Sequence, residues 1–434
     1  MPSPAQLRWF VSCVVMLFSA PVAAQVSFEE PPIDYHKAPL SDPISHLQKK
    51  LDASRAELEF DKKHGYLPSL LEQLGVKVSS QVLVFSKTSF QLRKISPRTP
   101  RAVYFSDEMY IGTVQGGDVL EISSVDPQQG AIFYALDQRK TLAPKFKRLT
   151  HQCIQCHASS MTEGVPGHMV RSVYTRPDGQ PVYSAGTFRT DQSSPLHQRW
   201  GGWYVTGTHG RQRHMGNLLV RKQDDPEKLN LDPGANVTDL KSLVDTSPYL
   251  SRHSDIAALM VLEHQGKMHN LITKANFQAR IARQNSDVMN KALSRPAGYE
   301  SPITKRLYTS GGDRMLKYML FSDEIKLEDS IVGSGAFTKE FAAQGPHDSK
   351  GRSLRDLDLK TRLMKYPCSY LIYGKGFDGL PKPVLRHVYR RLWEILTGKD
   401  TSDEFAHLSA SDRQAILEIL LETKPGLPDY WKKQ

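Results

Sequence analysis

The chain has 434 residues, of which 39% are hydrophobic and 24% are charged, so it can bury a sizeable core without disulfide or metal staples. This composition excludes a collagen-like fibre and a wholly disordered chain, and no later run approaches the roughly 20 apolar residues of a membrane span. The formal net charge of +11 is mildly basic and does not predict a nucleic-acid partner.

The first 24 residues have the pattern of a secretory signal peptide. Arg8 gives a basic start, residues 9–18 form a short apolar run, and residues 22–24 are small, as a cleavage site requires. We therefore expect cleavage before Gln25 and a periplasmic or secreted protein. Cleavage would remove one charged side chain, Arg8, and leave a mature chain with a net charge of +10.

Short β-branched and aromatic runs dominate the chain up to about residue 235. An extended, proline-containing lead-in over 25–45 and a helical pattern over 46–74 precede them. Asp178-Gly179 predicts a hairpin between strands at 170–175 and 181–185. The other expected strands are residues 82–85, 102–105, 110–114, 119–123, 131–136, 203–207 and 217–220.

The pattern after residue 235 is mainly helical. A long helix is expected over 255–284, with Ser254 as its N-cap. Two more are expected over 383–396 and 411–423, the second preceded by a capping box at 409–412. The sequence therefore predicts an α+β protein, with a β-rich region over residues 25–235 and a mainly helical region over residues 236–434.

Two of the four cysteines form a recognisable motif. Cys13 would leave with the signal peptide and Cys368 is isolated, whereas Cys153, Cys156 and His157 form C-x-x-C-H, the attachment sequence of c-type haem. Thiols three residues apart can form thioethers with two vinyl groups of one porphyrin, and the next imidazole can bind the iron. A thioredoxin-like pair would need a strand–motif–helix context, and a zinc site would need a second close pair. We therefore expect one covalent haem c.

Six stretches of the sequence, of which the first contains the motif, are distinctive. They are residues 153–160, 164–173, 184–190, 200–209, 351–359 and 366–370. In these stretches the chain resembles a largely uncharacterised family of exported bacterial proteins with one c-type haem motif, often labelled only as cytochrome c domain proteins. The resemblance implies haem c and electron transfer, without a known substrate.

The residue opposite His157 would set the function. A Met ligand raises the iron potential, a His ligand lowers it, and an open position allows ligand binding and catalysis. Met161 would share a helix face with His157, so it cannot be the distal ligand. The candidates are His168 and Met169 after a Gly-Val-Pro-Gly loop, His209, His214 and Met215 after two tryptophans, and His264, which shares a helical stripe with Met268. For His264 the alternative is a hydrogen-bonded core histidine.

Two arginines and two tryptophans each allow two interpretations, one at the haem and one in the structure of the fold. Arg171 and Arg189 suit the haem propionates, because a guanidinium can bind a carboxylate in a bidentate manner, or they are solvated charges at a strand edge. Trp200 and Trp203 either line the haem pocket or fill the core. We expect Cys368 to be a buried structural thiol.

Two functions follow from the motif. We favour single-electron transfer in the periplasm between redox partner proteins, with the helical region packing over the haem and acidic partners attracted by the positive charge. The alternative is a peroxidase- or oxidase-like haem oxidoreductase with an open distal site, in which the extra chain length builds a substrate pocket. The distal ligand distinguishes these two functions.

Overall fold

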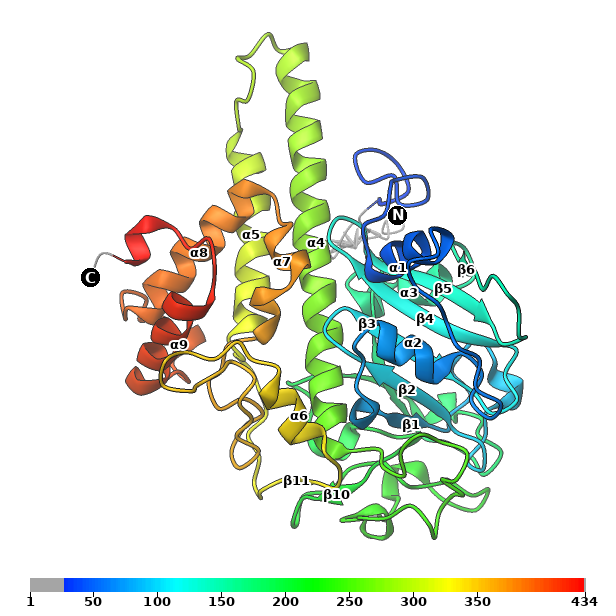
Figure 1. Ribbon diagram of the computed structural model, residues 1–434. Coiled ribbons are helices and arrows are strands. Elements are labelled where there is room, and N and C mark those ends of the chain that lie inside the picture. Colours follow the sequence, from blue (N-terminus) through cyan, green and yellow to red (C-terminus); the bar gives the residue numbers. More distant parts are fainter. Residues whose placement is uncertain (1–26, 433–434) are drawn as a thin grey trace, which may run out of the picture.

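The computed structural model describes residues 27–432 and confirms the expected α+β fold (Figure 1). The expected signal peptide lies outside the described residues. The main sheet has seven strands, and every neighbouring pair is antiparallel. Across the sheet the strands are β6 (Phe146–Arg148), β5 (Gly130–Asp137), β4 (Val119–Asp126), β3 (Met109–Thr113), β2 (Arg101–Phe105), β1 (Val82–Val84) and β9 (Trp203–Tyr204).

The two faces of the sheet cover two hydrophobic cores, because successive side chains of a strand point to opposite faces. Ile111 and its partner Ile122 belong to the face that packs against α1 (Pro43–Asp52) and α2 (Leu67–Gln73). The other face packs against α4 (Ile256–Ala292), which stands between the sheet and the C-terminal helices in Figure 1.

Helix α4 begins one residue later than expected. Its N-cap is Asp255, whose carboxylate accepts hydrogen bonds from the backbone N–H groups of Ala257 and Ala258. Ser254 has a different role, because its hydroxyl donates to the Tyr204 carbonyl at 2.6 Å and thereby ties the start of the helix to the sheet. The helix therefore starts at a fixed place relative to strand β9.

The other expected helices are present. The pattern over 46–74 corresponds to α1 and α2 with a loop between them, and the helices over 383–396 and 411–423 are confirmed, including the capping box of Ser409 and Asp412. One long helix, α5, was not predicted. The remaining helices are α3 (Ile154–His157), α5 (Pro302–Met319), α6 (Phe337–Ala343), α7 (Lys375–Asp378), α8 (Lys382–Leu396) and α9 (Ala410–Thr423).

The hairpin around Asp178-Gly179 differs from the prediction in its second strand. Strand β7 (Val170–Val173) pairs with β8 (Thr187–Thr190). Where a strand was expected, Tyr183–Ala185 forms a 3-10 turn, and it ends at Gly186, whose φ of 96° is favourable only for glycine. This turn displaces the second strand to β8.

The strand expected over 203–207 is divided between β9 and β10 (Gly207–Thr208), and β10 pairs with β11 (Val332–Gly333). The strand expected over 217–220 is absent, because Asn217 has a φ of 67° and its side chain bonds the backbone of Val205. A residue in the left-handed region interrupts an extended strand.

The larger hydrophobic core extends from strand β1 through α4 to the C-terminal helices, so the β-rich and helical regions pack together. The boundary expected near residue 235 stays a prediction. Within residues 27–432, no helix is both long and apolar enough to cross a membrane.

Candidate haem attachment site

The C-x-x-C-H motif forms a single helical turn that follows the edge strand β6. The Cys153 carbonyl accepts hydrogen bonds from the N–H groups of Cys156 and His157, at 3.2 and 2.9 Å, so the three residues of the motif share one turn. Both thiols are free; Cys153 is half-buried and Cys156 is exposed. Burial, reinforced by the Glu121 carboxylate, raises the pKa of Cys153 to about 11, so its thiol is protonated at neutral pH.

His157 is held by a reciprocal pair of hydrogen bonds with Gly167. Its Nδ1 lies 2.9 Å from the Gly167 carbonyl oxygen, and its own carbonyl accepts from the Gly167 N–H at 2.8 Å. A neutral imidazole that donates from Nδ1 keeps its lone pair on Nε2, and burial lowers the pKa of His157, which favours this neutral form. A carbonyl on the second ring nitrogen is the usual support of a metal-bound histidine.

Helix α4 fixes the segment that holds His157. The Asn270 amide donates to the His168 carbonyl at 2.6 Å and accepts from the His168 N–H at 2.8 Å. A Cβ atom on Gly167 would lie 2.1 Å from Asn270 Oδ1, so this approach requires glycine. The contacts run from Asn270 through Gly167 and His168 to His157. This support was not predicted, because nothing local in the sequence marks a pair of residues 102 positions apart.

Arg189 contacts the segment that directly follows the motif, and its predicted role toward a propionate stays a prediction. Its guanidinium donates to the Met161 carbonyl at 3.3 Å and pairs with Glu163 at 3.3 Å. Lys274 and Arg314 also pair with Glu163, at 3.3 and 3.9 Å. Three cations therefore surround one carboxylate, which leaves an excess of positive charge suited to propionates.

Arg171 is the partner of Arg189 in the β7–β8 register. Its Nε donates to the Thr187 hydroxyl at 2.8 Å, and its guanidinium covers the Tyr183 ring. These contacts are within the hairpin, so the structure places Arg171 next to a residue that contacts the motif segment.

His264 has the environment of a core histidine. Nδ1 lies 2.6 Å from Gln192 Oε1 and Nε2 lies 2.7 Å from Ser369 Oγ. Its ring stacks between Tyr318 and Phe321, and burial lowers its pKa to about 3. Both ring nitrogens are already bonded, so His264 is not available as a distal ligand in this conformation.

His214 and Met215 lie at the sheet edge remote from the motif. The Met215 N–H donates to the Arg199 carbonyl. His214 packs against Trp200, which lies just before β9. His157 instead contacts Phe133 of β5, and four strands of the sheet lie between β5 and β9. His209, also proposed, packs against His214 and belongs to the same remote group.

His168 is the distal candidate that shares a neighbour with His157. The Phe133 ring lies 4.8 Å from the His157 ring and 6.4 Å from the His168 ring. His168 stacks on Tyr110 at 4.0 Å, and its Nε2 lies 2.7 Å from the Ser123 hydroxyl. Its Nδ1 is buried without a hydrogen-bond partner in the described structure. The side chain is thus held against the sheet.

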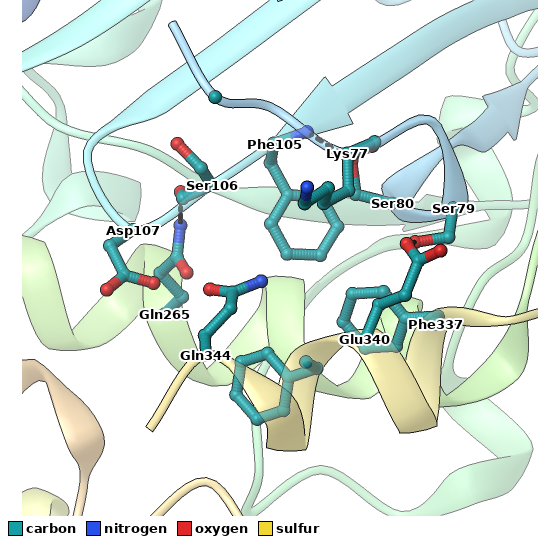
Figure 2. Close-up of a pocket in the computed structure, with 12 residues that line it drawn as sticks. Lys77, Ser79, Ser80, Phe105, Ser106, Asp107, Gln265, Phe337, Glu340 and Gln344 are labelled. Atoms are coloured by element: carbon teal, nitrogen blue, oxygen red, sulfur yellow. Dashed lines mark hydrogen bonds between the residues drawn. The ribbon is translucent and has the colours of Figure 1, made fainter. Parts of the chain in front are cut away.

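Two cavities lie away from the motif. One, of about 20 Å³, opens between the end of β2, α4 and α6 and has room for about one water (Figure 2). Gln265 and Glu340 line it from the two helices. The other, about 390 Å³, is lined by Tyr104, Thr113 and Tyr249 beside the first face of the sheet. Neither has a motif residue in its wall.

Cys368 is fully buried, as expected, and burial raises the pKa of its thiol to about 12. Trp200 and Trp203 belong to the larger hydrophobic core, so the structure supports the interpretation that they fill the core.

No family model matches the chain, and no curated protein or solved structure matches it. The motif and its surroundings are therefore the features of this chain that point to a function.

Proposed function

We propose that the protein is an exported c-type cytochrome that carries one covalent haem on Cys153 and Cys156 and transfers single electrons in the periplasm. The observation that carries this proposal is the pair of hydrogen bonds between Gly167 and His157, which we call the Gly167 clamp. It lies next to two free thiols, one exposed and one half-buried. The clamp leaves Nε2 of His157 as the donor atom that an iron ligand needs. The three residues therefore fit a haem c group.

Each residue has a defined task in this proposal. Each thiol adds across one vinyl group: a carbon–sulfur bond forms and the thiol hydrogen goes to the neighbouring carbon. His157 supplies Nε2, and the Gly167 carbonyl increases its basicity through Nδ1. Arg189 can neutralise a propionate. When bound, the haem supplies a one-electron iron couple.

Covalent attachment is the first test. The full precursor is expressed in a bacterium with an active cytochrome c maturation system, and intact mass and haem staining after denaturation are measured. We expect one haem per chain, loss of covalent haem in the double variant Cys153→Ala/Cys156→Ala, and retention in the control Cys368→Ala. Unmodified wild-type protein under conditions that mature a known cytochrome c would contradict the proposal.

A second function is a haem oxidoreductase with an open distal position. It is supported by the placement of His264, His214 and Met215, none of which contacts the motif turn in the described structure. Carbon monoxide distinguishes the two functions. If the spectrum of the reduced protein does not change when carbon monoxide is added, the result supports an electron carrier with a sixth iron ligand. If the spectrum is high-spin and shifts when carbon monoxide is added, the result supports an open iron position and chemistry with peroxide or oxygen.

A further inference from the structure

The helical hairpin of α4 and α5 projects beyond the rest of the protein. In Figure 1 the end of α4, the connecting loop and the start of α5 extend past the sheet and the C-terminal helices. We call residues 286–307 the hairpin tip. All residues from 291 to 299 are exposed, whereas the α4 residues nearer the sheet are mostly buried. The tip is therefore a separate surface from the proposed haem site.

Exposed apolar side chains are concentrated on this tip. Of the fourteen large hydrophobic residues exposed in the described chain, six lie within these 22 positions. Ile303 is 74% exposed and Val288 is 63% exposed, so these side chains contribute little to the fold. Clusters of this kind mark binding surfaces. The six are Val288, Met289, Leu293, Tyr299, Ile303 and Leu307.

Hydrogen bonds hold the loop at the hairpin tip in a defined conformation. The Tyr299 carbonyl accepts from the Asn290 amide at 2.8 Å and from the Ser286 hydroxyl at 2.9 Å. The Arg295 N–H bonds the Asn290 carbonyl at 2.8 Å. At the base, Tyr308 is buried in the larger core. The exposed side chains are thus presented by a held loop between two helices.

Positive charge accompanies these apolar side chains. Four basic residues, Lys291, Arg295, Lys305 and Arg306, outnumber two acidic residues, Asp287 and Glu300, which gives the tip a net charge of +2. The Arg295 guanidinium covers the Tyr299 ring at 5.1 Å. Long basic side chains can keep their charge in water while their stems lie along apolar surface.

We propose that the hairpin tip docks on the surface of an anionic lipid bilayer. Apolar side chains would enter the boundary between headgroups and acyl chains while the cations contact lipid phosphates, the combination that binds peripheral helices to membranes. A second copy of the chain is a poorer occupant, because it would bring two tips of charge +2 together. This docking needs no membrane-spanning helix.

The test measures co-sedimentation of the mature full chain with vesicles of phosphatidylglycerol and phosphatidylcholine, and with phosphatidylcholine alone. We expect binding to the anionic vesicles that weakens with salt. The variant Val288→Ser/Leu293→Ser/Ile303→Ser should bind at least tenfold more weakly. A charge variant, Lys291→Gln/Lys305→Gln, should lose the preference for anionic lipid.

The matched control is Phe90→Ser/Leu142→Ser, which removes two exposed hydrophobic residues outside the tip and should bind like the wild type. Circular dichroism and thermal unfolding of each variant show whether it is folded. Wild-type protein that stays in the supernatant, or a control variant that loses binding equally, would overturn the proposal. So would a wild-type dimer, measured by light scattering, that the triple variant converts to a monomer without any effect on lipid binding.

Discussion

A single amide connects the long helix to the proposed haem ligand. Replacing Asn270 with Ala removes both hydrogen bonds to the His168 backbone, and leaving those buried groups unsatisfied should cost about 1–3 kcal/mol. We expect a lower melting temperature and an altered spectrum of the haem-loaded protein, because the Gly167 clamp on His157 loosens. The control is Asn276→Ala, another buried α4 amide, which bonds the Gly379 carbonyl. An equal spectral change in both variants would contradict a positioning role for Asn270.

Glu324 should make stability depend on pH. Burial raises its pKa from 4.5 to about 7, although the Leu363 N–H donates to its carboxylate at 2.8 Å. Between these two values the folded state holds a proton that the unfolded state has released, so the stabilisation is complete below about pH 4.5 and is lost as the pH rises through 7. The difference in unfolding free energy between wild type and Glu324→Gln should therefore fall across this window, by at most about 3 kcal/mol. Urea unfolding at several pH values measures it; a constant difference would refute the assignment.

Asp255 joins the N-terminus of helix α4 to a neighbouring loop. One Asp255 oxygen caps the helix and the other accepts from the Gly335 N–H at 2.8 Å, which joins α4 to the loop before α6. Asp255→Ala should lower the free energy of unfolding by about 1–2 kcal/mol. Asp255→Asn should lie between that variant and the wild type, because it keeps one acceptor oxygen for the cap. Urea unfolding checks both, and an alanine variant as stable as the wild type would contradict the role.

The elements also show which features a sequence can reveal. Strands β1 to β5 were predicted to within three residues at their ends, because they are short β-branched or aromatic runs. The expected helix over 255–284 was eight residues short, since its exposed end, near Val288, no longer follows an apolar stripe. The C-x-x-C-H motif is a local pattern that the sequence displays directly, and the haem that it indicates stays a prediction. The Asn270 support and the remote position of Met215 depend on tertiary packing, which a local pattern does not contain.

For the protein as a whole, we expect the location of the positive charge to affect electron transfer more than the total net charge does. The cations around Glu163 place positive potential beside the motif, and such fields steer charged partners. Reduced, haem-loaded protein should therefore pass electrons faster to anionic ferricyanide than to a cationic cobalt complex, with a difference that shrinks above 0.1 M salt, where the screening length is about 10 Å.

Neutralising Lys274 and Arg314 to Gln should reduce this preference roughly two- to fivefold. The matched control, Lys382→Gln/Arg386→Gln, removes the same charge from exposed positions of α8, on the other side of α4 in Figure 1. Stopped-flow oxidation over a salt series measures both. If the two variants changed the preference equally, the rate of electron transfer would depend on net charge alone. The cations beside the motif would then have no specific role in recognising an acidic partner.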